Sequence, residues 1–315
     1  MDIVAFATIK LTLIAVVGFL LYRKQIIEEK AFNFLIFLVI NITVPCMAFS
    51  HLIENLKNNS HAPVGTFLLL SFSIFGASAL LGFLFPLTKR KDLKREFVSV
   101  VSFQNCGYLP LNIALFLFPA ALREEFITYT FLYILGFDIL MWSMGSFLIF
   151  KKAGERFKLS SVITAPIVGT LTALLCVYTG IARFIPSLVL DPMRMVGDTS
   201  FVLSMIILGC WLARIKPEGF AKLTGVVMHA SFIKLLVLPF LALLFVLKFN
   251  IVSLFGLFIV LQASMPSAVT LPIVARMRNA NSEFVSQGVL FTHIFSIFTT
   301  PFWLGLYLKF SHYTF

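Results

Sequence analysis

The chain is divided into apolar runs whose length matches the thickness of a membrane. An α-helix rises about 1.5 Å per residue, so about 20 apolar residues cross the hydrocarbon layer. Hydrophobic residues make up 59% of the 315 residues and charged residues only 12%, which is typical of integral membrane proteins. Ten runs are near or above this length: Ile3–Tyr22, Ala31–Ile53, Ala62–Leu87, Phe97–Phe118, Phe126–Phe150, Val162–Ile181, Met195–Ala213, Phe220–Leu247, Ile251–Ala275 and Phe284–Phe310. We therefore predict an all-α integral membrane protein with ten spans.

The loops between these runs differ in their positive charge. Most of the 25 Lys and Arg residues lie in alternate loops, within 23–30, 89–95, 151–158, 214–222 and 276–278. Because cytoplasmic loops are enriched in Lys and Arg, we expect these loops in the cytoplasm, both termini outside, and a location in the cytoplasmic (inner) membrane. The same rule accounts for the net charge of +11, so no nucleic-acid partner is expected. The first run lacks a small-residue cleavage site and is expected to remain as a span.

Two spans in the two halves of the chain are related by a constant offset. Glu125 and Lys151 flank the fifth span, and Glu283 and Lys309 flank the tenth span 158 residues later. Five spans is an odd number, so two such halves would lie upside down relative to each other. We predict two inverted five-helix repeats, 1–155 and 156–315, an architecture of many secondary transporters.

The fourth and ninth spans carry polar residues and prolines near their centres. Proline removes a helical hydrogen bond, and hydrocarbon offers no partner for an amide side chain, so these segments should face protein or a cavity. Interrupted helices at corresponding positions of two repeats indicate a transporter's binding site. We predict that these two helices cross there. The candidate substrate-binding residues are Gln104, Asn105, Pro110, Asn112, Gln262, Ser264, Pro266, Ser267 and Thr270, with Asn41 from a third break in the second span.

Ionisable side chains within the spans are candidates for charge coupling, because such groups are costly in a bilayer. Asp138 and Lys234 lie well inside the fifth and eighth spans. We expect Lys234 either to pair with an acidic residue or to offer its charge to an anionic substrate. His293 is a possible proton carrier, although packing is the commoner role for a lone histidine. Lys10 and Asp198 lie nearer the ends of their spans and should reach interfacial water.

Catalytic and metal-binding motifs are not found in the sequence. The four cysteines lie in apolar runs without ligand spacing, so we expect free thiols and no metal site. No hydrolase, zinc-protease or phosphate-loop motif is present. We therefore expect no enzyme and no cofactor.

The two interrupted segments resemble the paired proline-crossover motifs of the auxin efflux carrier family. The resemblance rests on F-Q-N-C-G-Y-L-P-L in the fourth span and L-Q-A-S-M-P-S-A-V-T-L-P-I-V-A-R in the ninth, and covers essentially the whole chain. It places the family's crossover asparagine on Asn105 and its crossover prolines on Pro110 and Pro266. Gln104 stands where a glycine is usual, and Pro272 is shifted by one position relative to plant members. The short loop between the halves is similar to that of bacterial members, described as permeases for malate and malonate.

The resemblance implies an elevator-type transporter. Spans one, two, six and seven would form a scaffold domain, and spans three to five and eight to ten would form a transport domain that moves against it. The substrates would be small carboxylates, such as malate, malonate or auxin-like acids, and the protein would be a homodimer.

The residues themselves also favour an anionic substrate, because amides, helix ends and Lys234 offer hydrogen-bond donors. We expect a secondary-active or facilitative transporter of small organic anions, with proton coupling, sodium coupling and no coupling all open. One alternative is a sodium-coupled symporter of the bile-acid type, for which Asp138 is the only deep carboxylate candidate. The other alternative is a non-transporting receptor or sensor, which the lack of a long loop disfavours.

Overall fold

The computed structural model describes residues 2–57, 63–85, 91–142, 149–150, 163–214, 220–311 and 313. Within these ranges the regular structure is helical, apart from one isolated antiparallel bridge between Gln104 and Ser267. The α-helices are α1 (Asp2–Arg23), α2 (Glu29–Leu38), α3 (Val44–Leu56), α4 (Val64–Leu84), α5 (Lys94–Ser102), α6 (Tyr108–Leu117), α7 (Ala120–Trp142), α9 (Ala165–Tyr178), α10 (Ser187–Arg214), α11 (Phe220–Phe232), α12 (Leu238–Lys248), α13 (Leu254–Ser264), α14 (Leu271–Met277) and α15 (Ser282–Ser311).

Six helical stretches in the described part of the chain are long and apolar enough to cross a membrane. They are Phe6–Arg23, Glu29–Leu56, Val64–Leu84, Ser187–Arg214, Leu223–Lys248 and Ser282–Ser311. Three shorter helices, α6, α9 and α13, are also apolar. The predicted all-helical membrane protein is thus confirmed. The count of ten spans and the inverted repeat stay predictions, and the expected boundary between the halves, 155/156, lies outside the described residues.

Two of the long stretches contain a π-helical turn that ends two residues before a proline. The turns are η1 (Val39–Thr43), between α2 and α3, and η5 (Ile233–Val237), between α11 and α12. A proline lacks the N–H that would bond the carbonyl four residues earlier. For Pro239 this carbonyl belongs to Leu235, and it accepts a hydrogen bond of 2.7 Å from Nε1 of Trp303 instead. The wider turn and the indole together let the helix continue past the proline.

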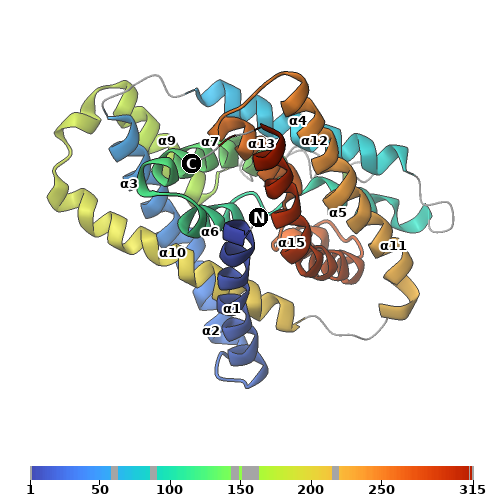
Figure 1. The fold of residues 1–315 in the computed structure, drawn as a ribbon. Coiled ribbons are helices and arrows are strands. Elements are labelled where there is room, and N and C mark those ends of the chain that lie inside the picture. Colours follow the sequence, from blue (N-terminus) through green and yellow to red (C-terminus); the bar gives the residue numbers. More distant parts are fainter. Residues whose placement is uncertain are drawn as a thin grey trace.

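The helices form two groups in space (Figure 1). In the first group α10 packs against α1 and α3, and α3 packs against α9. In the second group α4 packs against α5 and α7, and α15 packs against α11, α13 and α14. The ribbon shows α3, α9 and α10 on one side of the molecule and α4, α11 and α12 on the other. The first group consists of the helices expected in spans one, two, six and seven.

Glycines allow α1 and α10 to approach closely. A Cβ atom on Gly209 would overlap the carbonyl oxygen of Ala15, and one on Gly18 would overlap the carbonyl oxygen of Ile206. Small residues at helix contacts let backbones meet inside membranes, where packing rather than hydrophobicity holds helices together. The α1–α10 contact is therefore built for a fixed, close fit.

Candidate substrate site

The two interrupted spans meet through their non-helical segments. Residues 103–107 separate α5 from α6, and residues 265–270 separate α13 from α14. The N–H of Asn105 donates to the carbonyl of Pro266 at 2.7 Å, and a second backbone hydrogen bond of 3.0 Å, from residue 268 to residue 103, lies beside it. The polar centres of the fourth and ninth predicted spans are therefore in direct contact, and four helix ends point toward this crossing.

The two glutamines at the crossing are buried and only half satisfied. Nε2 of Gln104 donates to the hydroxyl of Tyr133, and Nε2 of Gln262 donates to the carbonyl of Cys106 at 3.1 Å. Oε1 of each glutamine has no hydrogen-bond partner among the described residues. Buried polar atoms in proteins are nearly always bonded, so these two oxygens are places where a donor or a cation could bind.

Asn105 is oriented by a histidine from α15. Its Nδ2 lies 3.3 Å from Nε2 of His293, and Nδ1 of His293 lies 2.8 Å from the carbonyl oxygen of Val289. A carbonyl only accepts, so Nδ1 carries the proton and Nε2 accepts from the Asn105 amide. His293 is therefore neutral in this arrangement, and the carbonyl oxygen and second N–H of the Asn105 amide stay available.

Three other predicted residues bond mainly to nearby backbone. Oγ of Ser267 donates to the carbonyl of Val100 at 2.6 Å, and Oγ of Ser264 donates to Leu261 of its own helix at 2.8 Å. Asn112 is different, because its Nδ2 donates both to its own helix and to Oγ of a serine of α10, 3.0 Å away. Asn112 thus connects α6 to the first helix group.

Lys234 is completely buried, at 0% exposure, in the η5 turn. Its Nζ donates to the carbonyl of Val101 at 2.8 Å, in the last turn of α5. No carboxylate among the described residues pairs with it. Lys234 therefore satisfies a carbonyl in the last turn of α5, where that helix enters the crossing.

A cavity of about 120 Å³ lies beside the crossing. Its lining includes Gln104, Asn105, Asp138 and Thr270, together with the first residues of α6. The hydroxyl of Thr164 donates to Oδ2 of Asp138 at 3.4 Å. The crossing and Asp138, which the sequence analysis named separately, thus share one cavity.

Two predicted residues lie elsewhere. Asn41 is exposed and donates to the carbonyl of Phe37 in its own helix at 3.0 Å, while Ile40 and Val44 line the cavity on either side of it in sequence. Pro110 is buried within α6 and does not line the cavity.

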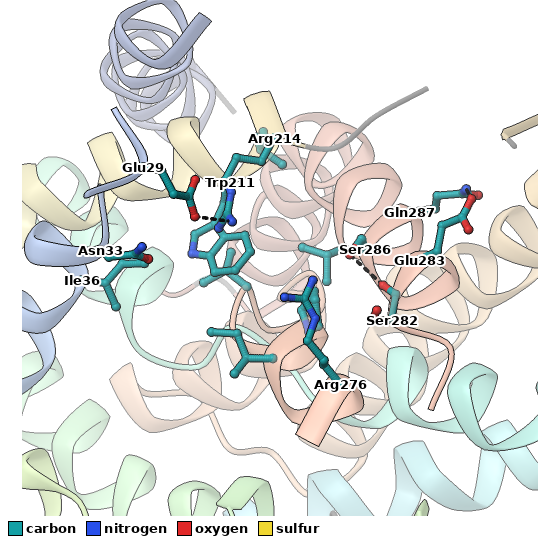
Figure 2. Close-up of a pocket in the computed structure, with 15 residues that line it drawn as sticks. Glu29, Asn33, Ile36, Trp211, Arg214, Arg276, Ser282, Glu283, Ser286 and Gln287 are labelled. Atoms are coloured by element: carbon teal, nitrogen blue, oxygen red, sulfur yellow. Dashed lines mark hydrogen bonds and ion pairs between the residues drawn. The ribbon is translucent and has the colours of Figure 1, made fainter. Parts of the chain in front are cut away.

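A larger cavity of about 870 Å³ adjoins the first, since Val269 lines both. It opens between α2 and α10 on one side and α14 and α15 on the other (Figure 2). Arg214 is engaged there, with Nη2 at 2.7 Å from Glu29 and its guanidinium carbon 4.9 Å from the centre of the Trp211 ring. Arg276 points into the cavity and forms no ion pair with a described residue. Sequence reasoning placed Arg214 and Arg276 among the basic loops, and Arg276 also ends the ninth-span motif, but neither was named as a site residue.

Comparison with known protein families identifies the chain. The family described as membrane transport protein matches residues 3–162 and 156–304, which together cover nearly all of the sequence. The chain belongs to this membrane transport protein family, which includes the auxin efflux carriers. No match was found among curated proteins.

Membership in the membrane transport protein family agrees with the sequence resemblance and with the lack of a catalytic motif, because proteins of this family are transporters. In the described part of the chain, no group of three His, Cys, Asp or Glu side chains could hold a metal ion.

Proposed function

We propose that this membrane transport protein moves small organic anions, such as mono- or dicarboxylates, across the cytoplasmic membrane by alternating access. The crossing would hold the carboxylate, and the larger cavity would connect the crossing to one side of the membrane. By the positive-inside rule that side would be the cytoplasm, because the cavity lies at the end of the molecule that carries Arg214 and Arg276.

One observation carries the proposal: a helix N-terminus and the Asn105 amide face the same small cavity. α6 begins without a side-chain cap, and Gly107 and Tyr108 at its start line the cavity, so their backbone N–H groups can meet an anion. Asn105 adds an amide N–H, and a protonated Lys234 would offset the opposing dipole of α5. The local field at this point therefore favours negative charge.

Arg276 supports the route to the site. Its guanidinium extends into the larger cavity, where a cation raises the local concentration of anions and speeds their arrival. Glu29 and Glu283 also line this cavity, but the charge of Glu29 is matched by Arg214. Among the described residues that line this cavity, Arg276 is thus the cation without an ion pair that an anion would meet on the way to Val269 and the crossing, although Glu283 lies in the same lining.

Asp138 is the proposed coupling residue. It lies in the crossing cavity with only the Thr164 hydroxyl as a side-chain partner among the described residues. A carboxylate there would repel an anionic substrate, whereas a carboxylic acid would not. We expect the anion to bind together with a proton on Asp138, so acidification on the substrate side should increase the affinity for the anion.

The two helix groups suggest how access would alternate. The first group, α1, α3, α9 and α10, is joined by close glycine contacts and would be the scaffold. The second group contains the crossing and would move against it as an elevator. A homodimer would form through the scaffold in this scheme.

A binding measurement tests the proposed substrate class. Purified protein is heated in the presence of individual mono- and dicarboxylates and indole acids, and the apparent melting temperature is recorded. A ligand at about 100 times its Kd stabilises the native state by about 2.7 kcal/mol. At least one anion should raise the melting temperature of wild type, and Asn105→Ala should lose most of this shift. Ser78→Ala, which removes a buried hydroxyl of α4, should keep it. Stabilisation by cationic solutes and by no carboxylate would contradict the proposal.

A sodium-coupled symporter is the second candidate, and one observation favours it. The two unpaired glutamine oxygens and the Asp138 carboxylate are the kind of ligands that sodium takes. If sodium chloride, but not potassium chloride, raises the melting temperature and Gln262→Leu abolishes the effect, this candidate moves ahead.

A further inference from the structure

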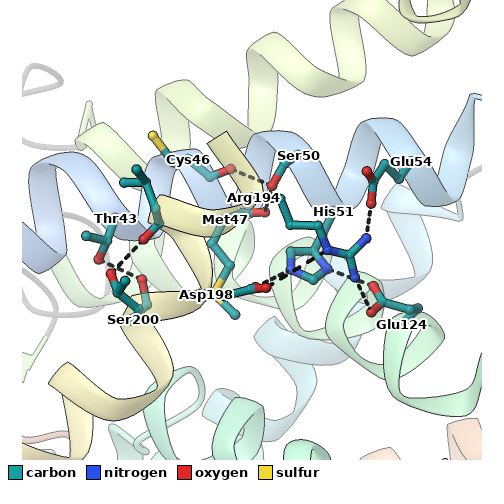
Figure 3. Close-up of polar contacts among 12 residues, drawn as sticks. Thr43, Cys46, Met47, Ser50, His51, Glu54, Glu124, Arg194, Asp198 and Ser200 are labelled. Carbon is teal, nitrogen blue, oxygen red and sulfur yellow. Dashed lines mark hydrogen bonds and ion pairs between the residues drawn. The ribbon is translucent and has the colours of Figure 1, made fainter. Parts of the chain in front are cut away.

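A second charged cluster lies at the other end of α10 from the large cavity, which Arg214 lines. Figure 3 shows this cluster. It contains His51 and Glu54 of α3, Glu124 of α7, and Arg194 and Asp198 of α10. Arg194 precedes Arg214 by 20 residues in the same helix, which is a distance of about 30 Å along its axis. If the large cavity faces the cytoplasm, this cluster lies near the outer face. Sequence reasoning assigned it no role.

His51 is at the centre of the cluster and is 1% exposed. Nδ1 lies 2.7 Å from Oε2 of Glu124, and Nε2 lies 3.0 Å from Oδ1 of Asp198. Ionised carboxylates only accept hydrogen bonds, so both ring nitrogens act as donors and the ring is an imidazolium. His51 therefore joins α7 to α10 through two charge-assisted hydrogen bonds.

Arg194 makes a second connection to the same glutamate. Its Nη2 lies 2.6 Å from Oε1 of Glu124, while Nη1 contacts Glu54 and Nε lies 4.0 Å from Oδ2 of Asp198. Nδ2 of Asn55 also donates to the backbone carbonyl of Glu124 at 3.1 Å. Glu124, at the start of α7, is thus held by side chains from both α3 and α10.

These contacts lie between the two helix groups, so they affect any movement of one group against the other. α3 and α10 belong to the first helix group, and α7 belongs to the second. The cluster therefore ties the two groups together at the end away from the large cavity. A cavity cannot open toward that end unless α7 separates from α3 and α10.

We propose that the cluster of His51, Glu54, Glu124, Arg194 and Asp198 is the outer gate of the transporter. This inference rests on the proposed alternating access. In the state seen here the gate is closed while the cavity on the basic side is open. Each transport cycle would separate Glu124 from His51 and Arg194 and then restore the contacts.

The gate should respond to protons, because it contains three carboxylates and two cations. Burial alone would raise the pKa of the Glu124 carboxyl, but the hydrogen bond from His51 and the charges of His51, Arg194 and Arg123 outweigh it, and the pKa lies below the ordinary 4.5. The other two carboxylates of the cluster share these cations with Glu124: Glu54 pairs with Arg194, and Asp198 pairs with His51. A lowered pKa favours the closed gate above pH 4.5, and this contribution is lost as pH falls through the lowered value. Below pH 4.5, further acidification should therefore favour the open gate.

The test measures how fast a hydrophilic maleimide reaches a thiol behind the gate. Thr128 of α7 lies in the interface, with 6% exposure, and its hydroxyl accepts from Asn55 at 2.9 Å. Thr128→Cys places a thiol there. Labelling is read by peptide mass spectrometry in nanodiscs, with the native cysteines as internal references, and each rate is divided by the rate for the same protein unfolded in urea.

Glu124→Gln and His51→Gln should each raise the rate at Thr128→Cys at least tenfold. The wild-type gate should also label faster when the pH is lowered from about 5.5 to about 3.5, the range in which Glu124 takes up its proton, so the test does not depend on a variant that folds poorly. Glu125→Gln is the matched control: it changes the neighbouring carboxylate, which bonds Tyr129 of its own helix, and should leave the rate unchanged. The proposed gate is contradicted if the labelling rate is the same in wild type, Glu124→Gln and His51→Gln at both pH values.

Anion binding is measured on the same preparations to separate this inference from the proposed function. Faster labelling without any anion binding would support the gate and count against the anion substrate. Anion binding with unchanged labelling would support the anion substrate and count against the gate.

Discussion

Asn105 and His293 lie 3.3 Å apart across the crossing, and the proton positions make His293 the acceptor. The pair joins the interrupted fourth span to α15, so the orientation of the amide in the crossing cavity depends on a helix more than 180 positions away in the sequence. His293 orients the Asn105 amide in this arrangement, and its expected role as a proton carrier stays a prediction.

Replacing His293 should weaken anion binding through Asn105. In His293→Leu the amide loses its acceptor and can rotate, so the Kd for the anion should rise about tenfold, which corresponds to about 1.4 kcal/mol. Calorimetry on single and double variants tests the coupling. Once His293→Leu is present, Asn105→Ala should cost much less than it does in wild type. Fully additive losses would show that the two residues act independently.

Removing the Trp303 indole N–H should lower the stability of the protein, because Pro239 of α12 cannot supply the missing hydrogen bond. Trp303→Phe leaves the Leu235 carbonyl without its donor, and we expect a loss of about 1–3 kcal/mol in stability. Pro239→Ala restores a backbone N–H that can bond this carbonyl, so the double variant should melt at a higher temperature than Trp303→Phe alone. If Pro239→Ala gives no such rescue, the proposed role of the indole is wrong.

The close contact of α1 with α10 predicts opposite effects at two glycines. Gly209→Ala forces a methyl group into the Ala15 carbonyl, and we expect a destabilisation of about 1–3 kcal/mol. Gly76 of α4 has nothing within 4 Å of the added methyl, so Gly76→Ala should leave stability unchanged or raise it by about 1 kcal/mol. Melting curves in one detergent compare the two. Equal effects would mean that helix propensity, and not the contact, decides.

The acid sensitivity of the protein should depend on Glu124. Its lowered pKa stabilises the described state above pH 4.5, and the stabilisation disappears as pH falls through the lowered value. Wild type should therefore lose melting temperature on acidification more steeply than Glu124→Gln, which has no such proton to take up. The difference should be small, because exposed and half-exposed ion pairs contribute little. If the melting temperatures of wild type and Glu124→Gln fall in parallel as the pH is lowered, Glu124 does not cause the acid sensitivity.

The crossing could be anticipated from sequence because its causes are local. Prolines and amides such as Pro266 and Asn105 are incompatible with a lipid-facing helix, and their occurrence in two spans predicts a shared protein environment. The family resemblance was predicted from the same residues and is confirmed by the family match.

Other features depend on which helices become neighbours, and no local pattern reveals this. The outer cluster brings together His51, Glu124 and Arg194 from three separate segments. Asp198 was expected to reach interfacial water, and its side chain is indeed 45% exposed, but it also bonds His51. Lys234 was expected to meet an acidic residue or an anion, whereas in this state it bonds the backbone carbonyl of Val101. A backbone carbonyl in a distant helix cannot be recognised as a partner from the sequence.

The central claim is that the crossing binds a carboxylate and carries it across the membrane. The most direct measurement is uptake of radiolabelled malonate, malate and indole acetate by proteoliposomes containing wild type or Asn105→Ala at equal protein content. We predict that wild type takes up at least one of these anions faster than protein-free liposomes, and that Asn105→Ala reduces this rate at least tenfold, as expected for loss of a hydrogen bond to a charged ligand. Uptake of every anion at the protein-free rate, or an undiminished rate with Asn105→Ala, would contradict the claim.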